Sequence, residues 1–353
     1  MPGRSGVVMI AAFPPPVTGA SVMSEHIAER LAGVMGVERA DVASNRGGVG
    51  YHVHRVAKHI FASAHLVRAR TRCDVAYFSL PSGWALLYVP WVVVAARLTR
   101  YRIVFHHHSF KYFDKRSPLL GLAVTLAGRR QAHVVLCARM GSQLARRYPR
   151  VTDVLTLSNA WAIRTAPAGD TGPGVGPVRL GHLSNLTLDK GLDTVIDVHA
   201  WMSGRAMDVS LDLAGPFTDD AAAQLVADAT ARDPERVVYH GAVSGSTKER
   251  FFAGVDVFVF PSRYRNEAEP LVIDEALSAG CRVVVTRRGC LCESDYQSAA
   301  VALLAVDAPV EAIAAAINAV AAQPRTTAIA EAGRRARVAE EHMGAFENWL
   351  RVS

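Results

Sequence analysis

Cysteines are scarce in this chain. The five cysteines of the 353-residue sequence are odd in number and form neither a disulfide framework nor a CxxC pair, which favours a reducing cytoplasm. Cys290 and Cys292 have no companion Cys or His pair at the spacing typical of zinc sites. No Asp-x-Asp motif stands in a suitable loop. We therefore expect no metal site.

Long apolar segments are also missing. The most apolar stretch, Trp84 to Leu98, is interrupted by Pro90 and is shorter than the roughly 20 residues of a transmembrane helix. It predicts a core helix, with contact of part of it to a membrane surface as the alternative. The run from Val7 to Phe13 precedes three prolines and predicts a first core strand rather than a signal peptide.

Acidic residues are nearly absent between Arg97 and Arg150. Twelve Lys and Arg residues accompany the single acid Asp114 there, a net of +11 in a chain whose net charge is +7. Such a region attracts an anionic partner: acidic lipid headgroups, lipid-linked phosphates or nucleic acid. Because no nucleic-acid-binding motif with interleaved stacking aromatics accompanies the charges, we expect no nucleic acid partner.

Apolar strands alternate with helical stretches along the whole chain, which predicts parallel, doubly wound sheets. The length suits two domains, and the Gly- and Pro-rich segment from Thr165 to Pro177 indicates a linker between them. The expected strands cover residues 7–12, 73–80, 103–107, 133–137 and 154–157 in the first half, and 178–182, 209–214, 237–240, 255–260 and 283–286 in the second.

Two features of the first half suggest ligand contacts. Gly19 precedes Ser21, a plausible N-cap, and would let the backbone approach a ligand at the start of a helix; the alternative is a plain tight turn. The cluster His106-His107-His108 closes an expected strand. Ligands of open α/β sheets gather at the carboxyl ends of strands, so these histidines are candidates, although a buried core histidine is the alternative.

In the second half, two acids bracket the start of a predicted helix. Glu267 lies in the loop before Pro270, and Glu275 lies about a turn and a half into the helix. The backbone NH groups near Glu269, Leu271 and Val272 lie between the acids, where they favour an anion or hydroxyl oxygens. The alternative is that the acids only complement the helix dipole or are solvated.

Lys190 stands at the start of another predicted helix, where a cation opposes the macrodipole. Its placement is explained by a bound anion such as phosphate. A solvated surface lysine is the alternative. A further helix is expected to open at Ser246, whose spacing to Glu249 suggests a capping box.

Taken together, the residues from Pro261-Ser262 through Glu267 and Glu275 to Gly289 resemble the retaining glycosyltransferases of family 4. In that family the first acid contacts the donor sugar and the second binds the nucleotide ribose, roles that fall to Glu267 and Glu275. The family's Lys and Arg on the donor diphosphate correspond to Lys190 and Asn185, so the Arg is replaced. The family's Gly-Phe-Gly between the acids is replaced by Ala268-Glu269-Pro270.

This resemblance implies the GT-B fold, with two Rossmann-like doubly wound domains facing a cleft. It places an acceptor-side domain at residues 1–165, a linker at 166–177, a nucleotide-sugar domain at 178–335 and a terminal helix at 336–353 packing back onto the first domain. By position, His108 matches the family's cleft-facing His, with His107 as the fallback, and Gly19 matches the glycine loop near the donor diphosphate. Asn185, Glu269, Pro270, Leu271 and Val272 join Lys190 and Glu275 as expected donor contacts.

The implied activity is metal-independent, retaining glycosyl transfer from a UDP- or GDP-linked sugar to a lipid-linked or polysaccharide acceptor in cell-envelope glycan synthesis. The expected location is cytoplasmic, peripheral at the inner face of an anionic membrane. Because Asn185 lacks the family's charge, a non-catalytic nucleotide-sugar-binding or scaffold protein is an alternative. A binder of phosphate surfaces or nucleic acid that uses only the basic region is another.

Overall fold

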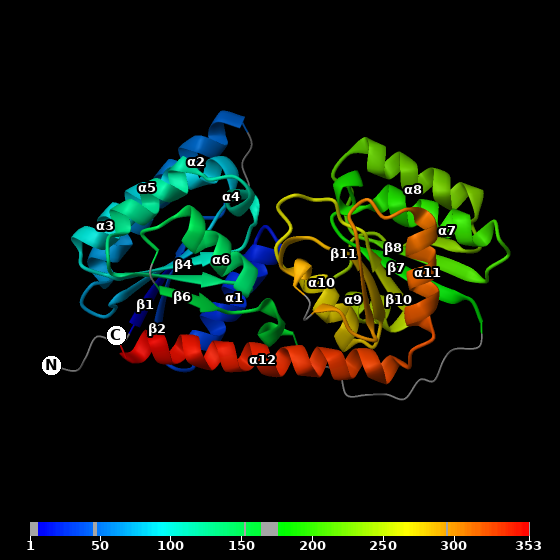
Figure 1. Cartoon of the computed structure of the whole chain (residues 1–353). Helices are drawn as coiled ribbons and strands as arrows, with labels where there is room; N and C mark the ends of the chain where they lie inside the picture. Colours follow the sequence, from blue (N-terminus) through cyan, green and yellow to red (C-terminus); the bar gives the residue numbers. More distant parts are fainter. Residues whose placement is uncertain (1–5, 45–47, 152, 164–175, 294–295, 353) are drawn as a thin grey trace. The chain divides into compact units, whose positions relative to one another are not determined.

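The chain divides into two compact units, which we describe separately. The computed structural model describes residues 6–44, 48–151, 153–163, 176–293 and 296–352 (Figure 1). Unit 1 comprises Met1–Ala162 and Ala339–Ser353, and unit 2 comprises Ile163–Val338. Most of the predicted linker at 166–177 lies outside the described residues.

Unit 1 is built on a six-stranded parallel sheet with the order β2-β1-β3-β4-β5-β6. The strand order reverses between β1 and β3, as it does in doubly wound sheets. The strands are β1 (Gly6–Ala11), β2 (Gly36–Asp41), β3 (Val75–Leu80), β4 (Arg102–His107), β5 (Gln131–Val135) and β6 (Asp153–Thr156).

Helices cover both faces of this sheet. Successive side chains of each strand point to opposite faces, so they pack alternately against the two layers of helices. Val7 and Met9 of β1 pack with Ile27 of the first helix and Phe346 of the last. The helices of unit 1 are α1 (Gly19–Ala32), α2 (Gly48–Ala69), α3 (Val89–Leu98), α4 (Lys111–Asp114), α5 (Pro118–Ala127) and α6 (Ala138–Arg147), with 3-10 turns η1 (Gly83–Tyr88) and η2 (Asn159–Ala162).

Unit 2 repeats the architecture with the order β12-β11-β10-β7-β8-β9, again parallel throughout. Here the order reverses between β7 and β10. The two doubly wound, Rossmann-like sheets expected from the sequence are thereby confirmed. The strands are β7 (Val178–Leu183), β8 (Val209–Ala214), β9 (Val237–Tyr239), β10 (Val257–Phe260), β11 (Arg282–Thr286) and β12 (Val301–Leu304).

The core of unit 2 lies between its sheet and the flanking helices, where Val195 and Ile317 pack on Leu211 and Val257. Its helices are α7 (Leu192–Ser203), α8 (Asp220–Arg232), α9 (Gly245–Gly254), α10 (Leu271–Ser278), α11 (Val310–Ala321) and α12 (Arg325–Val352), with 3-10 turns η3 (Leu188–Lys190) and η4 (Gly289–Cys292). The predicted boundary at 335/336 falls inside α12, whose residues from Ala339 onward belong to unit 1.

Two strands were not predicted, β2 and β12. Both are edge strands. In β2, Glu38, Arg39 and Asp41 interrupt the apolar pattern. Edge strands tolerate such residues because one side is open to solvent. The sequence pattern of β2 therefore does not predict a buried strand.

Two predicted helix starts were wrong. The N-cap of α1 is Thr18, and Ser21 is its capping-box partner three residues on. In α9 the N-cap is Ser244 and the partner is Thr247, so the box expected at Ser246 and Glu249 does not form. In both helices a hydroxyl earlier in the sequence accepts the backbone NH. Both Ser and Thr serve as N-caps, so the residue type alone does not select the position.

The stretch from Trp84 to Leu98 is partly as predicted. It forms η1 followed by α3, with Pro90 at the start of α3. Val89, Val92, Val93 and Ala96 are buried, whereas Trp84, Trp91 and Leu98 are 81%, 74% and 78% exposed. It is therefore amphipathic rather than a core helix throughout.

Candidate functional site

The strand order of unit 2 reverses between β7 and β10, so the loops that follow these two strands leave the sheet side by side. Open α/β sheets bind ligands outside the carboxyl ends of such strands. Residues 184–191 follow β7 and residues 261–270 follow β10. These are the two loops in which the sequence places Lys190 and Glu267.

Lys190 and Glu267 form an ion pair although they are 77 residues apart. The Lys190 Nζ lies 2.5 Å from the Glu267 Oε2, and the two side chains are 21% and 9% exposed. The ammonium group also faces the Tyr264 ring at 4.8 Å. Ser262 Oγ donates to the same Glu267 oxygen at 3.2 Å. A cation and an acid thus meet at the switch point, largely shielded from water.

Arg263 fixes the turn that carries Lys190. Its guanidinium donates to the Asp193 carboxylate at 2.8 Å and to the Leu188 carbonyl at 2.6 Å. Its backbone NH donates to the Asp189 carbonyl at 2.8 Å. The loop after β10 therefore holds the loop after β7 at two points and the first turn of α7 at a third. Arg263 could not be selected from the sequence, because a lone Arg in a charged loop is most often solvated.

Two glycines permit the close approach of these loops. Gly191 has φ +84°, and a Cβ there would lie 2.4 Å from the Pro261 carbonyl oxygen. Gly289 has φ +55°, and its Cβ would lie 2.4 Å from the carbonyl oxygens of both Glu267 and Ala268. Only glycine adopts such conformations without strain. The backbone that carries Glu267 is therefore seated directly against the η4 turn.

Helix α10 begins directly after this loop. Pro270 is its N-cap and makes no side-chain capping bond, so the NH groups of Leu271 and Val272 belong to the unpaired first turn of the helix. Glu275 lies one turn further on. Its Oε1 lies 2.5 Å from Lys248 Nζ, whereas its buried Oε2 has no hydrogen-bond partner among the described residues. That oxygen can accept a hydroxyl donor.

The Glu269 side chain does not point to the helix start. It is buried, accepts a hydrogen bond from the Tyr296 hydroxyl and lies 3.8 Å from the Arg335 guanidinium. Arg335 in turn pairs with Asp274 at 2.6 Å. The Glu269 carboxylate is therefore engaged by Tyr296 and Arg335 and does not make the ligand contact that the sequence predicts.

His182 in β7 and Ser184 just after it are polar groups that are not among the site residues predicted from the sequence. The His182 Nδ1–H donates to the Val259 carbonyl at 2.9 Å, and its Nε2 lies 3.0 Å from Ser184 Oγ. Burial, with a smaller effect of Lys190, lowers the pKa of His182 to about 4. The neutral imidazole links the two strands at the switch point. Asn185, the next predicted contact, is exposed.

In unit 1 the three histidines have different surroundings. His106 and His107 are fully buried, and His107 Nε2 lies 2.9 Å from His133 Nδ1 in a polar chain beneath the sheet end. His108 is only partly buried, and its Nε2 has no hydrogen-bond partner in the described part of the chain. Burial lowers the pKa of His108 to about 4. His106 Nε2 likewise has no partner among the described residues, and His108 is the most exposed of the three residues.

Gly19 is the first residue of α1, and a Cβ there would meet no atom within 4 Å. No neighbouring atom therefore requires a glycine at this position. The approach of a ligand to the backbone at Gly19 stays a prediction.

Neither a metal cluster nor a membrane span is found in what the structure describes. No group of three or more His, Cys, Asp or Glu side chains in the described ranges is arranged to hold a metal ion. Over the same ranges, every helix is too short or too polar to cross a bilayer.

Residues 177–323 match the family model for glycosyl transferases group 1. Unit 2 therefore carries a group 1 glycosyltransferase domain. The match covers β7 to α11 and includes Lys190, Glu267 and Glu275. No curated protein sequence matches the chain.

Solved structures match both units and identify the fold as GT-B. HepE of Anabaena in complex with UDP has a TM-score of 0.69 at 17% identity, covering 96% of this chain and 95% of HepE. Sucrose-phosphate synthase of Thermosynechococcus elongatus has a TM-score of 0.71 at 15% identity, covering 98% and 99%. WaaG, a glycosyltransferase involved in lipopolysaccharide biosynthesis, has a TM-score of 0.62 at 13% identity, covering 98% and 100%. At 13 to 17% identity these structures show the fold alone. What the domain does has to be argued from its own residues.

Proposed function

We propose that the protein is a retaining, metal-independent glycosyltransferase of family 4 that uses a UDP- or GDP-linked sugar as donor. The ion pair of Lys190 and Glu267 beside the open end of α10 carries this proposal. A cation next to unpaired helix NH groups suits a diphosphate, and the neighbouring carboxylate suits sugar hydroxyls. The HepE complexes with UDP and UDP-glucose support UDP as the first nucleotide to test.

In the proposed reaction, the bond from the anomeric carbon to the diphosphate breaks and a bond to the acceptor hydroxyl oxygen forms with retained configuration. The acceptor proton leaves to the departing diphosphate. Lys190 and the NH groups of Leu271 and Val272 stabilise the charge on the diphosphate. Glu267 orients the sugar hydroxyls while the ring gains oxocarbenium character. For His108 we propose a neutral hydrogen-bonding role toward the acceptor, consistent with the pKa lowered by burial.

Glu275 is the proposed ribose contact. Lys248 holds one carboxylate oxygen, which leaves the second, buried oxygen to accept from ribose hydroxyls. A hydrogen bond to a charged acceptor contributes about 1.5 to 3 kcal/mol. Loss of this carboxylate charge should therefore weaken nucleotide binding about 10- to 100-fold.

A thermal-shift panel of UDP, GDP and their sugars tests the donor site, since a ligand that binds only the folded state raises the melting temperature by an amount set by the ratio of its concentration to its Kd. We expect one nucleotide to stabilise the wild type, a reduced shift for Glu275→Gln, and an unchanged shift for the exposed Glu249→Gln on α9. Failure of every nucleotide to stabilise the protein would refute the proposal.

A nucleotide-sugar-binding protein without transfer activity is the second candidate, favoured by the exposed Asn185 at the position of the family's Arg. Both candidates bind nucleotide, so only product formation separates them. Release of nucleoside diphosphate that is lost in Glu267→Ala and Lys190→Ala supports the transferase. Nucleotide binding with no release in the presence of candidate acceptors supports the binder.

We also propose that the acceptor is lipid-linked or a polysaccharide, as in cell-envelope glycan synthesis, and that the protein acts at the cytoplasmic face of an anionic membrane. Trp84, Trp91 and Leu98 are exposed on η1 and α3, and Arg97 and Arg100 beside them are exposed as well. Exposed tryptophans with basic neighbours suit a lipid interface, where both the ring and the charge find partners.

Cosedimentation with vesicles that contain anionic lipid tests this surface. Binding should fall for Trp84→Ser/Trp91→Ser but not for Val17→Ser, an exposed apolar residue elsewhere in unit 1. It should also fall at an ionic strength of about 1 M, where charges are screened beyond about 3 Å. Binding that resists both changes would contradict a membrane contact through this surface.

A further inference from the structure

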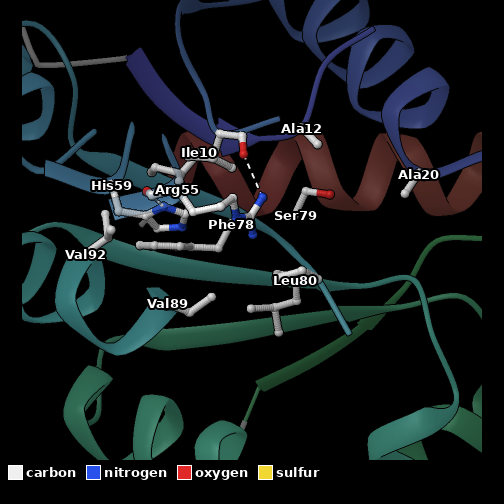
Figure 2. A pocket seen from close by; sticks show the side chains of 12 residues that line it. Ile10, Ala12, Ala20, Arg55, His59, Phe78, Ser79, Leu80, Val89 and Val92 are labelled. Carbon is white, nitrogen blue, oxygen red and sulfur yellow. Dashed lines mark hydrogen bonds between the residues drawn. The ribbon is translucent and has the colours of Figure 1, made fainter. Parts of the chain in front are cut away.

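Unit 1 contains a pocket at its own topological switch point, between the ends of β1 and β3. The cavity measures about 120 Å³ and is lined by side chains from these two strands and from α2 and α3 (Figure 2). Ala20, next to Gly19 at the start of α1, also lines it and is exposed, which places the opening at that end. The carboxyl ends of strands at a switch point are where open α/β sheets bind ligands.

The lining is apolar apart from a few groups. Ile10, Phe78, Leu80, Val89 and Val92 supply most of the wall. An apolar cavity of about 150 Å³ holds a molecule of the size of benzene. At about 120 Å³ this cavity is smaller, so it suits at most a single ring or a short alkyl segment.

Arg55 of α2 reaches in among these apolar side chains (Figure 2). The residue is 6% exposed. Its NH1 donates to the Val42 carbonyl at 2.7 Å, but its Nε and NH2 have no hydrogen-bond partner among the described residues. Within the same residues, no carboxylate forms an ion pair with it, and only the rings of Tyr51 and Tyr88 face the guanidinium, at 5.6 and 5.7 Å.

Such an arrangement is costly unless an anion completes it, because a buried charge without a partner is strongly destabilising. The two unpaired nitrogens, Nε and NH2, form the edge of the guanidinium that binds carboxylate or phosphate through two parallel hydrogen bonds. The nearby His59 does not compete for that anion. Burial lowers its pKa to about 4, and its Nδ1–H donates to the Arg55 carbonyl at 2.7 Å.

We propose that this pocket binds a small amphiphilic acid, with one oxyanion on the Nε and NH2 edge of Arg55 and an apolar body of about six carbons against Phe78 and Val92. The site shares no residue with the donor site proposed for unit 2. The proposal does not depend on whether the protein transfers a sugar.

Calorimetry on the full chain tests the proposal with benzoate, phenyl phosphate, inorganic phosphate and benzamide. Benzoate or phenyl phosphate should bind, and the tighter of the two identifies the oxyanion as carboxylate or phosphate. Benzamide, which has the same ring without the charge, and inorganic phosphate, which has the charge without the ring, should bind at least about tenfold more weakly. Equal binding of inorganic phosphate and phenyl phosphate would overturn the apolar part of the proposal.

The Arg55→Met variant should bind the acid about 30-fold more weakly, the loss expected for a charge-assisted pair of hydrogen bonds. It should melt no lower than the wild type, because an unpaired buried charge is replaced by an apolar side chain of similar length. The matched control is Lys58→Met on the same helix, whose Nζ pairs instead with Asp41. A folded Arg55→Met that binds benzoate or phenyl phosphate as the wild type does, or a wild type that binds none of the probes, would overturn the proposal.

Discussion

At the scale of single residues, the ion pair of Lys190 and Glu267 combines stability with the proposed chemistry. Both charges are largely shielded, and Glu267 accepts a further bond from Ser262. The two charges of a shielded pair attract each other, but both lose hydration on burial. The pair itself therefore adds little net stability. Breaking the pair on one side is costly because the remaining charge stays buried.

The Lys190→Met variant should therefore lose about 2 kcal/mol of unfolding free energy, and Lys190→Met/Glu267→Gln should recover most of that loss while remaining inactive. Urea unfolding measures the stability and nucleoside diphosphate release measures the activity. Arg236→Met, which breaks the exposed pair with Asp208, is the control and should change stability little. A double variant that is no more stable than Lys190→Met would show that the two residues do not act as a pair.

At the scale of secondary-structure elements, two short turns decide where the site residues lie. The η3 turn carries Lys190, and the η4 turn supports the loop that carries Glu267. Cys290 N donates to the Ala268 carbonyl at 2.9 Å, and Thr286 Oγ1 donates to the Ser262 carbonyl at 2.6 Å. Hydrogen bonds from β11 and η4 thus hold the loop after β10 in place.

Gly289→Ala should destabilise the protein by about 2 kcal/mol or more, because the new Cβ meets two carbonyl oxygens in a left-handed backbone conformation. Gly19→Ala is the matched control, since its Cβ meets nothing within 4 Å, and it should leave the melting temperature unchanged or slightly raised. Differential scanning calorimetry compares the two. If both variants melt alike, the close contact at Gly289 is not a constraint on the loop.

Helix α12 is anchored in unit 2 by Arg335. The guanidinium pairs with Asp274 of α10 at 2.6 Å, faces the Tyr296 ring at 3.9 Å and is 8% exposed. Asp274 lies next to Glu275, so this anchor also fixes the helix of the proposed ribose contact. Arg335→Met should cost about 3 kcal/mol in a chemical unfolding experiment, as breaking a buried pair does. The exposed Arg337→Met should cost much less. Similar losses for both would argue against the anchor.

At the scale of the whole molecule, buried neutral histidines make stability depend on pH. Burial lowers the pKa of His59, His108 and His182 to about 4 and that of His133 to about 3. It also lowers the pKa values of His106 and His107 well below their usual range. In the unfolded chain each of them takes up a proton below about pH 6.5. Between about pH 6.5 and pH 4 the unfolded state therefore binds more protons than the folded state.

We accordingly expect the free energy of unfolding to fall as the pH is lowered from about 6.5 toward 4, by up to about 1.4 kcal/mol per pH unit for each buried histidine. Replacing one, as in His133→Gln, should reduce the slope of stability against pH by about that amount in urea unfolding at several pH values. The exposed His52→Gln is the control. A slope that His133→Gln leaves unchanged would show that His133 is not buried and neutral.

Much of the fold was determined by the sequence. Parallel strands covered on both faces are continuous apolar runs, so β1, β3, β4, β8, β10 and β11 could be predicted, whereas the polar edge strand β2 could not. The residues of the glycosyltransferase domain could also be selected, because Lys190, Glu267 and Glu275 stand beside expected helix starts, where charges have a physical meaning.

The tertiary structure alone decided which of these groups meet. Lys190 and Glu267 come together because β7 and β10 are neighbours in the sheet, although 77 residues separate them in the chain. Glu269 turns to Tyr296 and Arg335 instead, and Arg263 supports the Lys190 turn. From the sequence, Arg55 is expected to be an ordinary surface residue of a helix. Only the packing of α2 on the sheet buries it. Strand pairing and burial fix these contacts through space, and no spacing along the chain encodes them.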